Sequence, residues 1–422
     1  MEQFYHAHRI DLAKCRGHRK CMRRCPTQAI RTRGGKAIIL EDLCVDCGDC
    51  LAVCPSEAIV PISDPIAEIS DRKYKVAVPT SVLYSQFDPS IHPYIIHLAL
   101  KELGFDEVVD INLSCSAVAR AYVKYMEKSP YRRPLIGSDC PATLRLIQVK
   151  YPELVELISP LDVPREVTAR EIKTLFPARL GLKPKDIGIV YISPCPAKIV
   201  SIRQPAEKAK SWFDDAIRVR DVYSLLLPHV VAIKSRFSKT QVPKDFRFSV
   251  GWAVLGGMTS AVKRENWLAV SGMDHIMKIF DDIENSRLRN VDFVEAFACM
   301  LGCVGGPFNI ENPYVSRMNS IKQREKYENE IEIDDAEIDR RIEEGYYFLE
   351  NPVLPRPTKY FDTDLETSIK RMKERERVLQ KLPQTDCGCC GAPTCMSFAE
   401  DLVRGEAKLN DCIFLGGSEH GA

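Results

Sequence analysis

The chain has 422 residues, of which 45% are hydrophobic and 28% charged, and its formal net charge is +1. This composition excludes global disorder and allows roughly two to four domains. The small net charge argues against a nucleic-acid binder, and the lack of an uncharged apolar stretch of about 18 residues argues against a membrane span. Because the first residues form no apolar leader, we expect a cytoplasmic protein whose seventeen cysteines bind metal rather than pair.

Residues 1–62 contain two cysteine motifs. The second has the C-x2-C-x2-C-x3-C-P spacing of two-cluster ferredoxins, in which the fourth cysteine reaches the other cluster. The first motif has a histidine in the second ligand position. With the crossover, we expect one [4Fe–4S] cluster on Cys15, His18, Cys21 and Cys54, and another on Cys25, Cys44, Cys47 and Cys50. The alternative is a three-cysteine first cluster with an exchangeable fourth site.

The charges around the two motifs differ. Residues 1–36 carry ten Lys and Arg against two acids, whereas acidic residues flank the second motif. A basic face suits an acidic electron-transfer partner, although it could be only a solvated surface. Neutral imidazole and nearby cations also lead us to expect the higher potential for the His18 cluster.

Residues 70–312 alternate short apolar runs with helical patterns, which predicts an α/β domain. The expected strands are Tyr74–Val78, Glu107–Ile111, Pro134–Gly137, Ile187–Ile192, Phe246–Val250 and Trp267–Val270, and the expected helices include Pro93–Leu103, Pro141–Val149 and Asp274–Ile283. Four cysteines lie in turn-like settings, several directly after an expected strand: Cys140, Cys195, Cys299 and Cys303. Because α/β proteins place their sites at the carboxyl ends of strands, we expect these cysteines to converge. Cys115 is expected to be a buried structural thiol.

Residues 313–383 are charge-dense and form a predicted helical wrap or linker, with helices at Ser320–Glu328, Asp335–Leu349 and Asp364–Leu379. Residues 384–422 hold the last five cysteines. Their C-x2-C-x4-C-x16-C pattern resembles a small helical [4Fe–4S] domain found in several multi-cluster proteins, with zinc as the alternative. This pattern selects Cys387, Cys390, Cys395 and Cys412, leaves Cys389 spare, and goes with an expected helix at Phe398–Gly405.

Three motifs of the central segment resemble the signatures of the large catalytic subunit of [FeFe] hydrogenases. The family's T-S-C-C-P, M-P-C-x-x-K and E-x-M-A-C-x-x-G-C correspond to G-S-D-C-P from Gly137, S-P-C-P-A-K from Ser193 and E-A-F-A-C-M-L-G-C from Glu295. The pair Val78-Pro79 also matches. This resemblance implies a two-lobed α/β hydrogenase-type domain behind the ferredoxin-like head.

The resemblance also implies roles for single residues. Cys140, Cys195, Cys299 and Cys303 would hold a [4Fe–4S] cubane. With the two clusters of the head (residues 1–62) and the cluster of the tail (residues 384–422), the chain would bind four [4Fe–4S] clusters. Cys303 would also bridge to a diiron subsite carrying CO, cyanide and a dithiolate. Lys198 would hydrogen-bond a cyanide, and Pro79, Ser193 and Phe297 would pack around the subsite.

This sequence departs from the family pattern at several positions, and these departures decide how much of the hydrogenase activity we expect of the chain. Asp139 replaces the family's proton-relaying cysteine; a carboxyl group also carries protons, although free aspartic acid ionises near pH 3.9 and free cysteine near 8.5. Ser193 and Phe297 replace methionines, and the segment Arg120–Tyr125 lacks the family's proton-path acids. Such departures are similar to those of the family's sensory branch. We expect Asp139, Lys198 and Cys303 to be the catalytic residues.

We therefore expect an iron–sulfur redox protein that interconverts H₂ with protons and electrons, slowly or as a sensor. Its partner would be an electron-transfer protein or another subunit of a redox complex. The alternative is a non-hydrogenase electron-transfer subunit whose central site holds only a cubane, so the sequence leaves open whether the chain is an enzyme. A third idea gives Asp139 and Ser193 a different ligand at the cubane.

Overall fold

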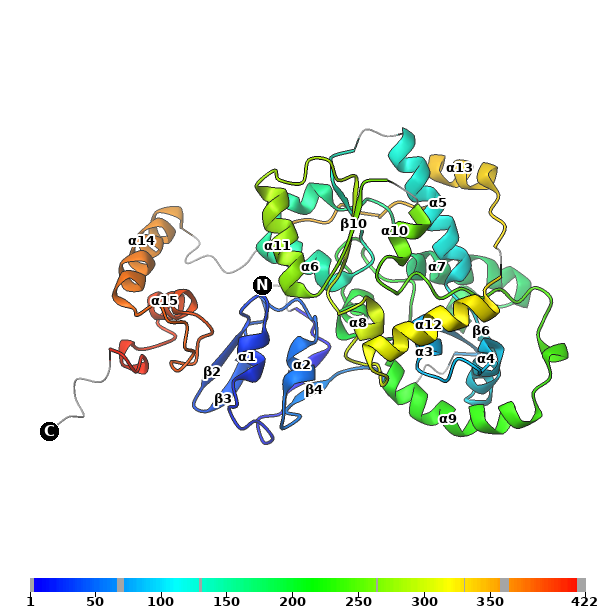
Figure 1. The fold of residues 1–422 in the computed structure, drawn as a ribbon, viewed down its shortest axis with the longest axis horizontal. Coiled ribbons are helices and arrows are strands. Elements are labelled where there is room, and N and C mark those ends of the chain that lie inside the picture. The colour runs from blue at the N-terminus through cyan, green and yellow to red at the C-terminus, as the bar shows by residue number, and fades with distance from the viewer. Residues whose placement is uncertain are drawn as a thin grey trace. The chain divides into compact units, whose positions relative to one another are not determined.

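The computed structural model describes residues 4–66, 72–128, 131–262, 265–329, 331–356 and 364–415. The chain forms two compact units: Met1–Ile62 together with Pro355–Ala422, and Ser63–Leu354. Figure 1 follows the chain by colour from one end to the other. Of the segments predicted above, the starts of 1–62 and 70–312 and the end of 384–422 include residues outside the described part.

The head, residues 4–62 of the first unit, is a twofold repeat of ferredoxin type. Strand β1 (His8–Ile10) pairs with β4 (Ile59–Pro61), and β2 (Ile30–Arg33) pairs with β3 (Lys36–Ile39), both antiparallel. Each half carries one short helix, α1 (Lys20–Arg24) and α2 (Asp49–Val53). Positive backbone φ angles at Gly17, Arg19 and Gln28 recur in the same order at Asp46, Gly48 and Glu57.

The C-terminal part of the first unit consists of α14 (Leu365–Lys381), α15 (Cys395–Val403) and cysteine-bearing loops. Helix α14 agrees closely with the prediction. The predicted bounds Phe398–Gly405 were wrong, because Thr394 caps α15 earlier: its Oγ1 accepts a hydrogen bond from the Ser397 amide at 3.1 Å.

The second unit contains two parallel sheets, which confirms the predicted two-lobed α/β fold. The first has the order β6 (Glu107–Val108), β5 (Tyr74–Pro79), β8 (Ile187–Ser193) and β9 (Asp215–Arg218). The second has the order β10 (Trp267–Ser271), β11 (Phe293–Phe297) and β7 (Leu135–Ile136). Both sheets direct their carboxyl ends toward the cysteine loops described below.

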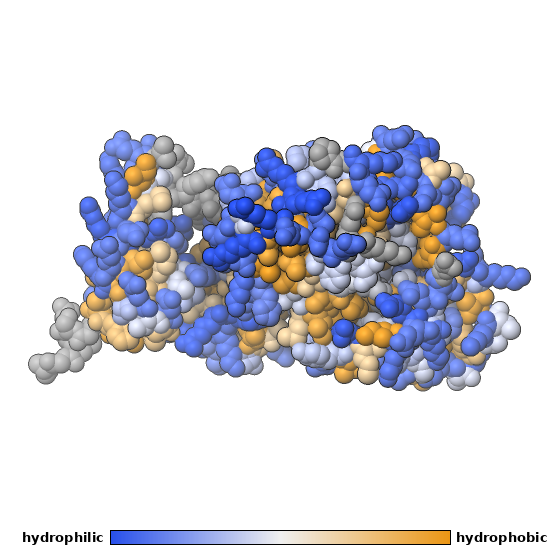
Figure 2. All heavy atoms as spheres, turned by 45° about the horizontal axis from the view of Figure 1, so that its top comes forward, coloured by the Kyte–Doolittle hydropathy of each residue, from blue (hydrophilic) through white to orange (hydrophobic). Residues whose placement is uncertain are grey.

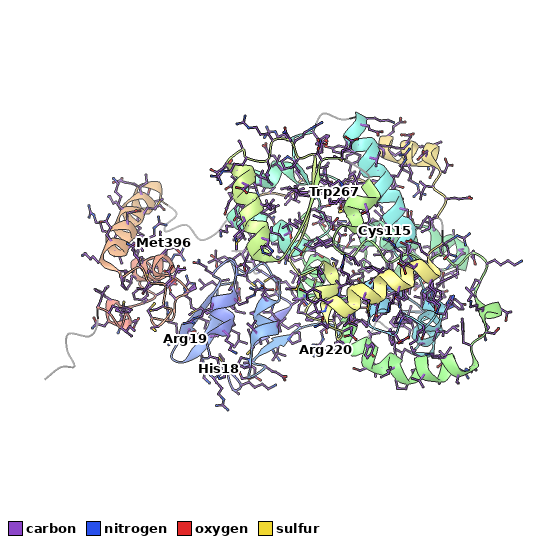
Figure 3. All side chains as sticks on the ribbon, in the orientation of Figure 1. His18, Arg19, Cys115, Arg220, Trp267 and Met396 are labelled. Atoms are coloured by element: carbon purple, nitrogen blue, oxygen red, sulfur yellow. The ribbon has the colours of Figure 1, made fainter. Side chains whose placement is uncertain are left out.

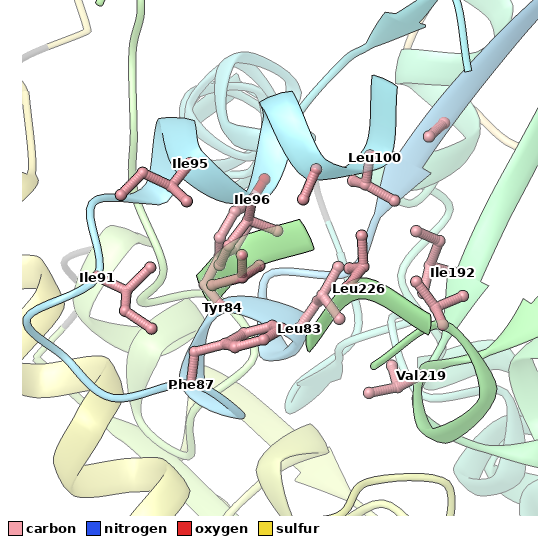
Figure 4. Close-up of a cluster of buried hydrophobic side chains, with 14 of the residues drawn as sticks. Leu83, Tyr84, Phe87, Ile91, Ile95, Ile96, Leu100, Ile192, Val219 and Leu226 are labelled. Atoms are coloured by element: carbon pink, nitrogen blue, oxygen red, sulfur yellow. The ribbon is translucent and has the colours of Figure 1, made fainter. Parts of the chain in front are cut away.

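Helices surround both sheets: α3 (Val82–Ser85), α4 (Pro93–Glu102), α5 (Asn112–Lys128), α6 (Pro141–Lys150), α7 (Pro164–Leu180), α8 (Pro196–Arg203), α9 (Val219–Arg236), α10 (Gly257–Val262) and α11 (Met273–Glu284). A large hydrophobic core lies between α4, α9 and the first sheet, where Tyr84, Ile96 and Leu226 are fully buried (Figure 4). Polar and apolar side chains intermix on the face seen in Figure 2. No described helix is long and apolar enough to cross a membrane.

One predicted element of this unit was wrong, and two predicted helices have different bounds. Phe246–Val250 forms no strand; Phe248 and Val250 bury their side chains in the core, and the Phe248 carbonyl accepts from Asn329 instead of from a ladder partner. Helix α12 (Pro313–Tyr327) begins before Ser320, because Asn312 caps it and proline suits its first turn. Helix α13 (Asp335–Glu343) ends before Gly345, whose φ is +74°.

Candidate functional site

All four central cysteines lie in loops that follow strands of the second unit, and Cys299 and Cys303 share the loop after β11. Cys140 follows β7 and caps α6, and Cys195 follows β8 and caps α8; each helix has proline in its first turn. Burial is the main cause that raises the pKa of the Cys303 thiol to about 12. The charge of Lys198 lowers this pKa, and the charges of Cys195 and Cys140 raise it further. The structure therefore brings Cys140, Cys195 and Cys303 together.

Glycines allow the Cys303 loop to reach its neighbours. Gly302 has φ +94°, and a Cβ there would meet the Ala253 carbonyl at 2.5 Å. A Cβ at Gly306 would meet the Pro194 carbonyl at 2.4 Å. Only glycine fits these close approaches, so the loop's glycines seat Cys303 against the Cys195 turn.

Lys198 is the cation of this site. Its Nζ lies 3.4 Å from Cys303 Sγ and 3.6 Å from Asp139 Oδ2, and the residue is 4% exposed. Burial alone would lower the pKa of Lys198, but the charges of Cys303 and Asp139 raise it well above its ordinary value. The ammonium group therefore stays charged inside the protein and requires anions beside it.

Asp139 has a second donor, since Trp252 Nε1 donates to its Oδ1 at 3.3 Å. Both side chains line a small cavity together with Thr80, Ser81, Ile111, Arg165, Tyr191, Lys198, Ala253 and Cys303. As described, that lining does not include Pro79, Ser193 or Phe297. Ser193 Oγ donates to the Cys195 carbonyl at 2.9 Å, so this hydroxyl shapes the Cys195 turn.

Arg165 in α7 is a site residue that the sequence analysis missed. It is 4% exposed, its Nη2 donates to Ser201 Oγ at 3.1 Å, and its Nε and Nη1 have no partner among the described residues. A guanidinium buried with two unused donors beside Lys198 is suited to an anionic group in the cavity. No motif surrounds Arg165 in the sequence, so no local signal pointed to it.

Glu295 is a second missed titratable group. It accepts from the amides of Gly256 and Thr259, both at 2.8 Å. Burial raises its pKa to about 7, and the charge of Asp139 contributes to the rise. A carboxyl group with this pKa can take up and release protons near neutral pH.

Cys299, the fourth central cysteine, and Cys115 differ in burial. Cys299 is half-buried on the turn after β11. Cys115 is buried inside α5 (Figure 3), and burial together with the charge of Asp139 raises the pKa of its thiol.

In the head, the predicted ligand sets are close together. Burial and the charges of Cys54 and Cys15 raise the pKa of Cys21, while burial and nearby charges that include Cys25 raise the pKa of Cys44, Cys47 and Cys50. Backbone amides donate to the sulfurs of Cys15, Cys25 and Cys54 at 3.2–3.4 Å. Such N–H···S bonds are those expected around cluster thiolates.

His18 lies between two positive-φ residues, Gly17 and Arg19, as Cys47 lies between Asp46 and Gly48. The two loops thus share a conformation, and His18 occupies the register position of a ligand. Its side chain is exposed and makes no hydrogen bond or ion pair with the described residues (Figure 3).

Two histidines beside the second cluster set were missed by the sequence analysis. His8 Nε2 lies 3.9 Å from Cys44 Sγ and 3.8 Å from Cys50 Sγ, and its Nδ1 lies 3.3 Å from Asp46 Oδ1. His6 Nδ1 lies 2.8 Å from Asp46 Oδ2. Burial alone would raise the pKa of Asp46, but the two histidines hold this pKa well below its usual range. A carboxylate-held ring facing thiolates tunes a metal site.

His8→Phe is therefore expected to lower the potential of the cluster that Cys25, Cys44, Cys47 and Cys50 are predicted to bind. In the tautomer with the proton on Nε2, His8 would donate to the two thiolates, and losing this donor destabilises the reduced form. A shift of roughly 60 mV corresponds to a tenfold change for a one-electron couple. EPR-monitored redox titration measures it. His6→Phe removes a ring that bonds Asp46 instead of the thiols, so it should shift the potential less; equal shifts would contradict the role of His8.

In the tail, three predicted ligands are close together. Burial raises the pKa of Cys390, and the charges of Cys387 and Cys412 add to it. Cys395 begins α15, and its amide donates to Asp386 at 2.6 Å. The spare Cys389 is exposed.

Three family models match the chain. The model described as iron only hydrogenase large subunit, C-terminal domain, matches residues 75–266 and 262–307, more than half of the chain. A 4Fe-4S dicluster domain matches residues 7–55, and an Fe-S cluster family matches residues 382–414.

Individual relatives are more distant. Iron hydrogenase 1 of Clostridium pasteurianum is 24% identical over 256 residues, which cover 50% of this chain and 44% of the relative. The NADP-reducing hydrogenase subunit HndD of Solidesulfovibrio fructosivorans is 23% identical over 381 residues, which cover 70% of this chain and 63% of the relative. A solved variant of [FeFe]-hydrogenase HydA1 from Chlamydomonas reinhardtii aligns with a TM-score of 0.49 at 16% identity, and the alignment covers 69% of this chain and 98% of that structure. The chain thus spans less than two thirds of either of these two curated relatives.

Proposed function

The chain belongs to the family of iron-only hydrogenase large subunits, and from this premise we propose that it interconverts H₂ with two protons and two electrons, slowly or as a sensor. It is a hydrogenase-like iron–sulfur redox protein. The observation that carries the proposal is the buried contact of Lys198 with Cys303 and Asp139, where strands of the second sheet and β8 end.

The residues around this contact fit an anionic metal group. Cysteine thiolates are the ligands of iron–sulfur clusters, and Cys140, Cys195, Cys299 and Cys303 would hold a cubane. Lys198 and the two unused donors of Arg165 would compensate negative charge on the group. A diiron subsite on Cys303 would supply the chemistry that activates H₂.

The chain's own residues have separate tasks in this proposal. Asp139 places its carboxylate beside the site, where it would take up and release protons, and the indole N–H of Trp252 orients that carboxylate. The positive charge of Lys198 compensates the negative charge of the buried site. The loops carrying Ala253 and Gly302 approach each other closely beside the site. Pro79, Ser193 and Phe297 would surround the group.

Electrons would pass through the three further [4Fe–4S] sites, two in the head and one in the tail. Their partner would be an electron-transfer protein or another subunit of a redox complex, as HndD is a subunit by its name. A thiol-rich, oxygen-sensitive chain of this kind suits the cytoplasm.

Infrared spectroscopy of the full chain matured with the diiron group tests the proposal. CO and cyanide bands that shift under H₂ are expected, because Cys303 and Lys198 would bind the group. The Cys303→Ala variant should lack these bands while keeping the head and tail clusters, as judged by iron content. A wild-type protein with iron for four cubanes and no such bands contradicts the proposal.

A second candidate function is electron transfer through a central cubane alone. As the side chains stand, the cavity beside Cys303 has room for about one water molecule. The segment Arg120–Tyr125 of α5 also lacks the family's acids, and Arg120 and Lys124 there bind Asp335 and Asp339 of α13. The infrared experiment separates this candidate from the first.

A further inference from the structure

The tail is bound to the head of the same unit at two of its own predicted iron ligands. Arg23 Nη2 donates to the Cys387 carbonyl at 3.1 Å, and Arg33 Nη1 donates to the Cys390 carbonyl at 3.2 Å. Arg23 belongs to α1, the helix that carries the head ligand Cys21. Arginines of the head therefore hold the loop that bears half of the tail's predicted ligands.

One side chain, Met22, lies between the two predicted sites. It is fully buried and follows Cys21 in α1. Its methyl group is so close to Gly388 that a Cβ there would come within 3.0 Å of it. Arg19 Nη1 also donates to the Gly388 carbonyl at 3.2 Å (Figure 3). A single polarizable thioether thus separates a ligand of the first head site from the tail's ligand loop.

Further contacts make this arrangement rigid. Asp401 of α15 is completely buried and accepts from Arg31 Nε at 2.7 Å and from Arg33. The Thr32 amide donates to the Gly391 carbonyl at 2.7 Å. The backbones approach so closely that a Cβ at Gly391 would lie 2.0 Å from the Thr32 carbonyl oxygen. The tail is therefore a fixed part of the head rather than a tethered module.

We propose that the tail site exchanges electrons directly with the first head site across Met22. The first head site is that of Cys15, His18, Cys21 and Cys54, and the tail site is that of Cys387, Cys390, Cys395 and Cys412. The inference rests on the iron–sulfur assignment made under the proposed function. One electron leaves one [4Fe–4S] cluster and enters the other; no bond is made or broken and no proton moves.

The variant Gly391→Ala in the full chain tests this route. Position 391 has φ +82°, and the added methyl group would collide with Thr32 and force the tail away from the head. Gly405→Ala is the matched control: it lies in the tail at φ +74°, with nothing within 4 Å of an added Cβ. Both variants place alanine at a similar positive φ angle, but only the first breaks the contact.

EPR of the reduced proteins, with iron content measured for each, gives the readout. Cys412→Ala, which removes a tail ligand, provides the head-only reference spectrum. In the wild type and Gly405→Ala, we expect the tail signal to be broadened by magnetic coupling to the head. In Gly391→Ala, we expect an uncoupled tail signal and at least tenfold slower electron passage between tail and head after rapid mixing with a reductant.

An uncoupled tail signal in the wild type overturns the inference, and so does coupling that persists in Gly391→Ala with full iron content. If Gly391→Ala loses tail iron, Arg19→Gln combined with Arg23→Gln weakens the same contact from the head side, and persisting coupling there overturns it. A tail that binds zinc overturns it as well. None of these readouts uses H₂, so a failure of the proposed activity is distinguished from a failure of this route.

Discussion

Asp139→Cys is expected to raise the rate of H₂ turnover at least tenfold, which corresponds to about 1.4 kcal/mol in the barrier. The Asp139 carboxylate is fixed by an ion pair with Lys198, whose Nζ lies 3.6 Å from Oδ2, and by a hydrogen bond from Trp252 Nε1 at 3.3 Å. A thiol is a weaker hydrogen-bond partner, so it can turn toward the site, and free cysteine keeps its proton at neutral pH. The rate is measured as H₂-dependent dye reduction by the matured protein.

Asp139→Asn is the control for this change. The amide keeps the shape of the side chain and can still accept from Trp252, but it cannot exchange a proton, so turnover should fall. If Asp139→Cys matches the wild-type rate while its CO and cyanide bands are intact, proton delivery is limited elsewhere. The basic outer part of α5, with Arg120 and Lys124, would then be the cause.

Lys198→Met is expected to abolish both H₂ turnover and the CO and cyanide bands. Methionine has a similar length but no charge, so Asp139 and Cys303 would be buried without a cation. Breaking a buried ion pair in this way costs about 3–5 kcal/mol of stability. Band area per iron and the free energy of unfolding measure the two effects.

Lys208→Met separates the two effects. Lys208 is also buried, 5% exposed, and its Nζ lies 2.9 Å from Asp162 Oδ2, outside the site. Its replacement should cost comparable stability and leave the bands in place. Equal loss of bands in both variants would show that Lys198 acts only through the fold.

The head was predictable because its ligand spacing alone constrains the backbone. Tight cysteine spacing sets the loop conformation, and the paired positive-φ residues around His18 and Cys47 follow from the repeat. The strand-end positions of Cys140 and Cys195 were predictable for a similar reason, since breakers follow apolar runs at both places. Such local patterns carry their own geometry.

Long-range pairings carry no local signal, so they were missed. Arg165 has the sequence context of an ordinary helix residue, and only the fold buries it beside Lys198. The basic face of the head was predicted as a docking surface for an acidic partner. In the structure, Arg31 and Arg33 instead form ion pairs with Asp401. Part of the head's positive charge is therefore neutralised by a residue of the same chain.

The pairing of Arg31 with Asp401 also sets an order of assembly. The two residues are 370 positions apart, so at about 5–20 residues per second a ribosome makes the partner roughly 20–75 s later. During that interval Arg31 of the head has no Asp401 carboxylate to pair with. Completion of the first unit therefore waits for the last part of the chain, and early termination would leave an unfinished head rather than a protein lacking one appendage.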